Sequence, residues 1–102
     1  MLPKSLRLSR PDFLQTKKFG QSLSFSHFSI IYIPHVPGRA AIVTSSKLSK
    51  SAVIRNRLRR QIYSAIPKSE LDIIIFPKPS MLKLSHEEIS IALNSLVSKL
   101  SH

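Results

Sequence analysis

The feature of this chain that most constrains its fold is the stretch LDIIIF at residues 71–76, which is apolar except for Asp72. An almost unbroken apolar run of this length is typical of a strand that is covered on both faces. Pro67 precedes the run and Pro77 follows it, and proline cannot continue the hydrogen bonding of a regular element. The stretch therefore predicts a buried central strand, which needs a sheet beside it and helices to cover it.

Two amphipathic helices are predicted, one before and one after this strand. The first, at residues 49–66, has apolar side chains three or four positions apart, which form one stripe on a helix. The stripe consists of Ile54, Leu58, Ile62 and Ala65 or Ile66. The second, at residues 85–100, opens with a capping box of Ser85 and Glu88. Its stripe is Ile89, Ala92, Leu93, Leu96, Val97 and Leu100.

A third and shorter helix is predicted near the N-terminal end. Ser9 suits the N-cap position, Pro11 the first turn, and Asp12 the positive end of the helix dipole. We expect this helix to end near Phe19, with Gly20 in the left-handed conformation that often closes a helix.

Strands are predicted between this N-terminal helix and the helix at residues 49–66. Residues 21–33 alternate with a period of two, a turn follows at residues 34–38, and residues 40–44 are predicted to be a further strand. We expect the segments 21–33 and 40–44 to form an antiparallel hairpin. The prediction is one domain over residues 1–102, an α+β fold in the form of a two-layer α/β sandwich with the order α-β-β-β-α-β-α.

The chain is strongly basic, with 16 Lys and Arg residues against 5 Asp and Glu and a formal net charge of +11. No acidic residue occurs between Asp12 and Glu70, and six basic residues lie between Lys47 and Arg60. Such clustering is typical of a surface that binds a polyanion, and nucleic acid is favoured. A helix face that is merely solvated and an anionic membrane surface are the alternatives.

The composition argues against several other classes. There is no cysteine, so disulfides and thiolate chemistry are excluded. The four histidines lack metal-ligand spacing, and Glu87 and Glu88 are explained by the first turn of a helix. We therefore predict no catalytic and no metal site in the protein itself. No apolar run approaches the roughly 20 residues that span a bilayer, and residues 1–13 lack a secretory signal, so a cytoplasmic location without membrane contact is expected.

The stretch SSKLSKSAVIRNRLRR at residues 45–60 is similar to the signature of a known family, the protein component of bacterial ribonuclease P. In that signature a lysine-rich segment leads to Ala-Val, then to Arg-Asn-Arg and a further basic pair. Supporting similarities are Arg7-Leu8, Asp12-Phe13, Gly20, residues 72–75 and the amphipathic helix at the C-terminal end.

The resemblance implies that the chain is a subunit of a ribonucleoprotein that removes the 5′ leader from precursor tRNA. It implies that the ribonuclease P RNA performs the hydrolysis with Mg²⁺ that is bound mainly through the RNA. The protein alone would then not be an enzyme, although it would be part of one. The family fold also contains a left-handed β-α-β crossover around the basic helix, whereas general handedness rules favour the opposite sense.

The resemblance also assigns roles to individual residues. The expected contacts to the catalytic RNA are Lys47, Lys50, Arg55, Asn56, Arg57, Arg59 and Arg60. The expected contacts to the leader, in a cleft between the first helix and the sheet, are Phe13, Lys17, Phe28 and Ile31. Lys17 and Ile31 stand where the family often has aromatic residues, so stacking on leader bases is expected to be reduced.

Three other functions are weighed against this one. A ribosomal or ribosome-assembly protein would share the composition but not the arginine signature. A DNA-binding protein that reads the major groove with residues 55–60 would need a helix where residues 40–44 are predicted to be a strand. A free-standing nuclease lacks clustered acidic residues.

Overall fold

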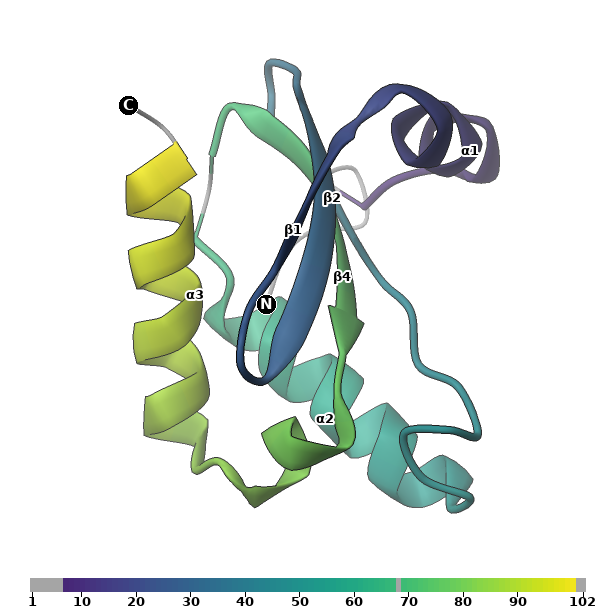
Figure 1. Cartoon of the computed structure of the whole chain (residues 1–102), viewed down its shortest axis with the longest axis vertical. Helices are drawn as coiled ribbons and strands as arrows, with labels where there is room; N and C mark the ends of the chain where they lie inside the picture. Colours follow the sequence, from purple (N-terminus) through teal and green to yellow (C-terminus); the bar gives the residue numbers. More distant parts are fainter. Residues whose placement is uncertain (1–6, 68, 101–102) are drawn as a thin grey trace.

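Three α-helices and a four-stranded sheet make up the part of the chain that the structure, a computed structural model, describes: residues 7–67 and 69–100. Helix α1 (Arg10–Phe19) is followed by strands β1 (Gln21–Ser24), β2 (Phe28–Pro34) and β3 (Ala40–Ile42). Helix α2 (Ala52–Ala65), strand β4 (Leu71–Pro77), the 3₁₀ helix η2 (Pro79–Lys83) and helix α3 (His86–Leu100) complete the fold. The predicted order of helices and strands is confirmed (Figure 1).

Strand β4 lies at the centre of the sheet, whose strand order is β1-β2-β4-β3. It pairs antiparallel with β2 on one side and parallel with β3 on the other. Its first five residues, from Leu71 to Ile75, are all buried. The prediction of a buried central strand from the apolar run is therefore confirmed.

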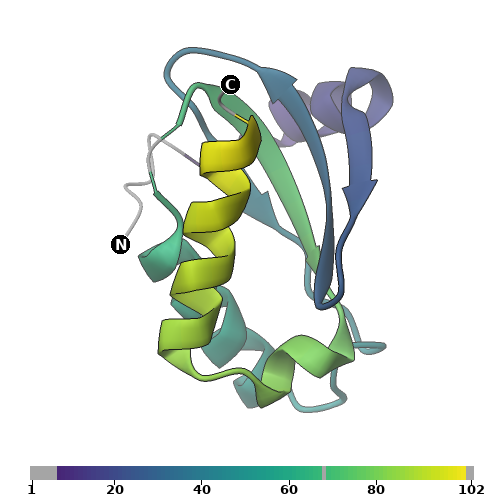
Figure 2. The same cartoon turned by 60° about the vertical axis from the view of Figure 1, so that its left-hand side comes forward.

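The two faces of the sheet are covered by different helices. Phe28, Ile30, Ile73 and Ile75 point to the face that packs against α2 and α3 and share one core cluster with Leu58 and Ile62 of α2 and Ile89 and Leu93 of α3. Helix α1 packs against β2 and β4 on the opposite face. Figure 1 shows α3 and α1 on opposite sides of the strands, and Figure 2 shows α3 lying in front of the sheet. Helices α2 and α3 thus cover the central part of one face of the sheet, α1 shields part of the other, and β1 stays exposed.

The predicted hairpin between residues 21–33 and 40–44 is wrong. The segment 21–33 itself folds into the antiparallel pair β1 and β2, with Leu23 opposite Ile30. Strand β3 is only three residues long and pairs with β4, so that β3, α2 and β4 form a parallel crossover. The physical reason is that β4, the most apolar strand, takes the central position between β2 and β3. The left-handed sense of this crossover stays a prediction from the resemblance.

Gly20 is required for close packing and not for a left-handed backbone. Its φ of −74° and ψ of 162° are extended, so the predicted conformation is wrong. A Cβ atom built on Gly20 would lie 2.6 Å from the backbone oxygen of Thr16 and 2.7 Å from Cγ2 of Ile31. Helix α1 therefore approaches β2 so closely at this point that no side chain fits.

The other helix boundaries follow the sequence signals. In the capping box of α3, the backbone nitrogen of Ser85 donates to Oε1 of Glu88 at 3.0 Å, and the backbone nitrogen of Glu88 donates to Oγ of Ser85 at 3.1 Å. Helix α2 starts at Ala52, three residues later than predicted, because Ser51 acts as its N-cap. Of the helices that the structure describes, none has both the length and the apolar character needed to cross a bilayer.

Candidate nucleic-acid interface

Helix α2 presents a basic face to solvent because its apolar stripe is buried. Leu58 and Ile62 are 2% and 0% exposed and fix the rotation of the helix against the sheet and α3. The side chains on the opposite side of the helix from Leu58 and Ile62 must then point outward. The exposed residues on this side are Asn56, Arg57, Arg59 and Arg60, while Arg55 is half-buried at its margin.

Several side chains of this face are already oriented. Nη2 of Arg59 donates to Oδ1 of Asn56 at 2.7 Å, which holds both side chains in one direction. Nε of Arg55 is buried and has no hydrogen-bond partner among the described residues. A buried donor without a partner costs free energy, so the position of Arg55 is fixed by the packing around it and not by a hydrogen bond from this atom.

A hollow of about 320 Å³ adjoins the second turn from the end of α2. It is lined by Arg7, Ile42, Arg59, Arg60 and Tyr63. The guanidinium of Arg7 lies over the ring of Tyr63 at 4.5 Å, a cation–π contact that keeps this third arginine beside the other two. The hollow therefore gathers three guanidinium groups from two segments of the chain, and planar guanidinium groups suit phosphate oxygens.

The segment before α2 extends the basic surface. Leu48 is 6% exposed and anchors the segment, while Lys47 and Lys50 on either side of it are exposed. The backbone nitrogen of Leu48 donates to the oxygen of Ser45 at 3.0 Å, and the nitrogen of Ile54 donates to Oγ of Ser51 at 3.3 Å. The two lysines therefore flank the N-terminal end of α2, whose dipole also favours anions.

The basic side chains of this surface form no ion pair with an acidic residue in the described ranges 7–67 and 69–100. The ion pairs found there all involve Asp12 or Asp72, with Arg39 or His35 as the partner. The charge of α2 and of the segment before it is therefore not neutralised within this part of the protein. Such a surface attracts a polyanion over several ångströms and releases counterions when the polyanion binds.

A second candidate surface lies between α1 and the sheet, and three of the four predicted leader contacts are found there. Phe13 is half-buried and Lys17 is exposed, and their spacing of four residues places them on one side of α1. Ile31 is half-buried on the sheet face that α1 covers, close to Gly20. One aromatic, one cationic and one aliphatic side chain thus lie on α1 and on the strand against which it packs, and their contacts to a leader stay a prediction.

The prediction that Phe28 shares this surface is wrong. Phe28 is 4% exposed and belongs to the core on the opposite face of the sheet. Its ring packs against Phe25 with centroids 5.1 Å apart. The reason is the period of two in a strand, which places residues 28 and 31 on opposite faces.

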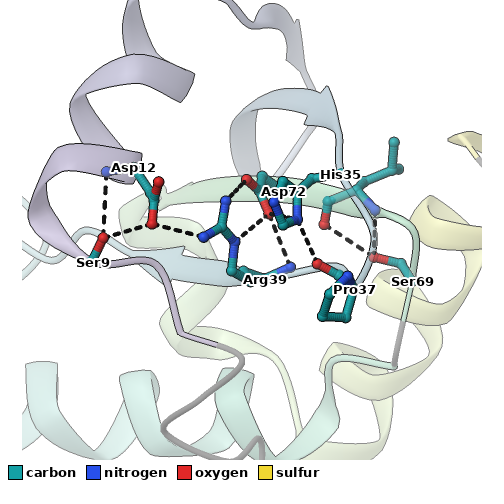
Figure 3. Close-up of polar contacts among 8 residues, drawn as sticks. Ser9, Asp12, His35, Pro37, Arg39, Ser69 and Asp72 are labelled. Carbon is teal, nitrogen blue, oxygen red and sulfur yellow. Dashed lines mark hydrogen bonds and ion pairs between the residues drawn. The ribbon is translucent and has the colours of Figure 1, made fainter.

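Sequence reasoning missed a polar cluster beside α1, shown in Figure 3. Nε and Nη2 of Arg39 donate to Oδ1 and Oδ2 of Asp72 at 3.0 Å and 2.6 Å, and Nη1 donates to Oδ2 of Asp12 at 2.7 Å. Hydrogen bonding to Asp72 raises the pKa of Arg39, and a hydrogen bond from Ser9, followed by the charge of Arg39, lowers the pKa of Asp12. The signal in the sequence was Asp72 itself, because a lone charge in an apolar strand needs a partner.

The acidic residues do not form a metal site. No group of three or more His, Asp or Glu side chains in the described residues is arranged to hold an ion. Asp12 and Asp72 are bound to Arg39, and Glu88 is bound to the cap of α3. The residues present therefore do not fit a magnesium ion bound by the protein alone.

Comparison with known proteins identifies the family. The sequence model described as Ribonuclease P matches residues 2–101. The chain belongs to the ribonuclease P protein family. A ribonuclease P protein component from Microcystis aeruginosa is 34% identical over 111 residues, which cover 96% of this chain and 92% of the relative.

Solved ribonuclease P proteins share the fold. The protein from Thermotoga maritima matches with a TM-score of 0.74 and 27% identity, over 91% of this chain and 96% of that one. A protein from Staphylococcus aureus matches with a TM-score of 0.69 and 26% identity, over 95% of each chain. As a member of the ribonuclease P protein family, the chain is the protein subunit of a ribonucleoprotein endonuclease of tRNA 5′ maturation, and it has an RNA partner.

Proposed function

We propose that this chain binds the ribonuclease P RNA through the basic face of α2 and the lysines before it. We propose also that it holds the 5′ leader of precursor tRNA at the surface between α1 and the sheet, and that it does so in the cytoplasm. The observation that carries the proposal is the set of basic side chains on and before α2, which form no ion pair with an acidic residue among the described residues.

The two surfaces suit two different parts of the RNA. The α2 surface offers guanidinium groups at fixed positions, which favours the phosphates of a folded RNA with a defined shape. The α1 surface offers Phe13 for stacking, Lys17 for a phosphate and Ile31 for an apolar contact, which favours a single strand with unpaired bases. Its single aromatic side chain supports a sequence-tolerant contact with few bases.

Magnesium enters this proposal through the RNA. We infer that the ions of the reaction are held by the RNA and the substrate, since Asp12, Asp72 and Glu88 are bound within the protein and the described residues contain no cluster of three or more possible metal ligands. The protein contributes by neutralising phosphates, which lowers the concentration of magnesium that the RNA needs in order to fold and to bind its substrate.

The test is cleavage of a precursor tRNA at low magnesium by the cognate ribonuclease P RNA, with and without this protein. We expect cleavage at the mature 5′ end only when both are present, and none with the protein alone. If the protein gives no stimulation while the RNA is active at high magnesium, the proposal is contradicted and a ribosomal or assembly role is favoured.

A second arm separates the two surfaces within the same assay. Alanine at Arg57 and Arg60 is expected to raise the protein concentration needed for half-maximal stimulation. Alanine at Phe13 is expected to leave that concentration unchanged and to raise KM for precursor tRNA. An equal effect of both variants on assembly would contradict the division into two surfaces.

A further inference from the structure

Helix α1 has little apolar contact with the rest of the molecule. Of its ten residues, only Thr16 is buried. Leu14 and Phe19, two of its three large apolar side chains, are 54% and 64% exposed. A helix that buries so little apolar surface is not positioned by the hydrophobic effect alone, so its few polar contacts decide where it lies.

At its C-terminal end, α1 is fixed by close packing and by the chain itself. The backbone nitrogen of Gly20 donates to the oxygen of Thr16 at 2.7 Å, and Ile31 lies directly beside Gly20. The next residue, Gln21, already belongs to β1 and pairs with Tyr32 of β2. This end of α1 is therefore held against the sheet by packing and by its connection to β1.

At its N-terminal end, α1 is held by the backbone hydrogen bond from Leu8 to Ala40 just before the helix and, within its first turn, by an ion pair. Oδ2 of Asp12 accepts from Nη1 of Arg39 at 2.7 Å and from Oγ of Ser9 at 2.6 Å. The Asp12 side chain is 33% exposed and that of Arg39 is 18% exposed, so the pair is partly shielded from solvent. Partial shielding makes an ion pair stronger than one on the open surface.

Arg39, which directly precedes the edge strand β3, is itself bound to the central strand β4. Its guanidinium binds both oxygens of Asp72, whose side chain is 3% exposed. Its backbone nitrogen donates to the oxygen of Leu71 at 3.2 Å, and its backbone oxygen accepts from the nitrogen of Ile73 at 2.9 Å. Through Arg39, the first turn of α1 is thus connected to β4 and not to a loose loop.

We propose that the Asp12–Arg39 ion pair is a positioning contact that sets the direction of α1 over the sheet and thereby the width of the leader-binding surface. Phe13 follows Asp12 directly, and Lys17 lies one turn further on. Without the ion pair, α1 keeps its fixed point near Gly20 and, before its first turn, the hydrogen bond from the backbone nitrogen of Leu8 to the oxygen of Ala40 at 2.9 Å. The first turn, which lies between these two points, then loses its side-chain contact with the sheet and shifts. Phe13 then shifts relative to Ile31, and a single strand between them loses its fit. This inference rests on the proposed binding of the leader.

The test compares Asp12→Ala with Glu87→Ala in the holoenzyme reconstituted with ribonuclease P RNA. Both variants remove one exposed or half-exposed carboxylate from the first turn of a helix, so net charge and helix-dipole effects are matched. Asp12→Ala leaves Arg39 bound to Asp72, so no buried charge loses its partner. The measured quantity is the ratio of the dissociation constants of mature tRNA and of precursor tRNA with a five-nucleotide leader.

Asp12→Ala is expected to lower this ratio by about three- to tenfold, the size of effect of a misplaced positioning contact. The affinity of the protein for ribonuclease P RNA alone is expected to stay within about twofold, and Glu87→Ala is expected to leave the ratio unchanged. Asp12→Glu, which keeps the carboxylate, is expected to lower the ratio less than Asp12→Ala does. The expected loss is opposite in sign to a pure charge effect, since removing a carboxylate strengthens RNA binding by electrostatics alone.

A failure of the proposed leader binding can be distinguished from a failure of the positioning role of the ion pair. If the wild-type holoenzyme shows no preference for the precursor, the proposed leader binding fails. If the wild type shows the preference and Asp12→Ala retains it with unchanged circular dichroism, the positioning role of Asp12 and Arg39 is overturned. If Asp12→Ala also loses affinity for ribonuclease P RNA alone, the contact is a general structural one and the inference is likewise overturned.

Discussion

At the scale of single residues, the protein contains one buried charge whose neutralisation is complete. Asp72 is 2% exposed in the central strand and receives three hydrogen bonds from Arg39, two from the guanidinium and one from the backbone nitrogen. A buried ion pair adds little stability compared with an apolar pair, but removing one partner leaves a desolvated charge. The Arg39–Asp72 pair therefore adds little to the free energy of unfolding, but the loss of either partner alone lowers it strongly.

Arg39→Ala is expected to lower the free energy of unfolding by about 3 kcal/mol, because Asp72 then remains buried without its cation. Arg39→Lys is expected to be destabilising as well, since an ammonium cannot bind two carboxylates in the same forked geometry. Urea unfolding followed by circular dichroism measures both. The control is Arg57→Ala, which removes an exposed arginine and is expected to change stability by less than about 0.5 kcal/mol. Equal stability of Arg39→Ala and the wild type would contradict the role given to the pair.

At the scale of elements, α2 and α3 each contribute one side to the core and leave the other side exposed. Each uses an apolar stripe to build the core, and the remaining surface is left for other contacts. In α2 this surface is basic and is not balanced by acids within the described residues. In α3 the charged residues instead complete the helix itself, with Glu88 in the capping box.

The double variant Arg57→Ala with Arg60→Ala is expected to weaken binding to ribonuclease P RNA by about thirtyfold, at roughly 1 kcal/mol for each phosphate contact. Its circular dichroism spectrum is expected to match the wild type, because both side chains are exposed and lie off the apolar stripe. The matched control is Lys18→Ala with Lys99→Ala, which removes the same charge from α1 and α3. An unfolded double variant would mean that the orientation given to α2 is wrong. An equal loss in the control would mean that the basic face of α2 plays no specific part in binding.

The capping box of α3 predicts a pH dependence of stability. The hydrogen bond from the backbone of Ser85, followed by that from its side chain, lowers the pKa of Glu88 below its ordinary value. The folded state therefore binds fewer protons there, and the contribution to stability is present above the ordinary pKa and is lost as the pH falls through the lowered one. In urea titrations between pH 7 and about pH 3, the difference in stability between the wild type and Glu88→Gln is expected to shrink towards acid. A difference that stays constant with pH would contradict the ionised cap.

At the scale of the whole molecule, three of the 5 acidic residues have partners within the protein, while most of the described basic residues are exposed. Two of the 5 acidic residues bind Arg39 and a third closes the start of α3. The net charge of +11 is therefore carried largely by the surface. This distribution favours fast association with RNA and strong dependence on ionic strength.

For binding to ribonuclease P RNA, the logarithm of the association constant is expected to fall with the logarithm of salt concentration with a slope of about −4 to −5, if about six phosphates are neutralised. Fluorescence titrations at several salt concentrations measure this slope. The Arg57→Ala and Arg60→Ala double variant is expected to reduce its magnitude by about two. A slope near zero for the wild type would contradict the electrostatic account.

Local patterns predicted more of this fold than long-range pairing did. The central strand, the apolar stripe of α2 and the capping box of α3 were predicted because each depends on residues close together in sequence. The partner of β3 was not, because Ala40 and Ile42 fit equally well beside β2 or beside β4. Gly20 was predicted for the wrong reason, since its close contact with Ile31 arises only when α1 packs on the sheet.

The candidate site, too, was predictable where it depends on local patterns and not where it depends on distant residues. The exposure of the basic face of α2 follows from helical periodicity and was predictable, whereas the individual RNA contacts stay predictions. The face on which Phe28 lies was also predictable from the period of two, but its assignment was transferred from the family instead. Arg39 escaped notice because a single arginine in a turn gives no pattern, and its two partners lie 27 and 33 residues away.

The central place of β4 has a consequence for how the chain folds as it is synthesised. Both neighbours of β4 precede it in sequence, and β4 ends only at Pro77. A growing chain therefore completes the β1–β2 hairpin, β3 and the whole of α2 before the strand that joins them exists. Until residue 77 has left the ribosome, the apolar stripe of α2 lacks the complete sheet against which it packs. The arginines of α2 are already exposed at that stage. The most basic segment of the molecule is thus available to nucleic acid before the molecule has a core.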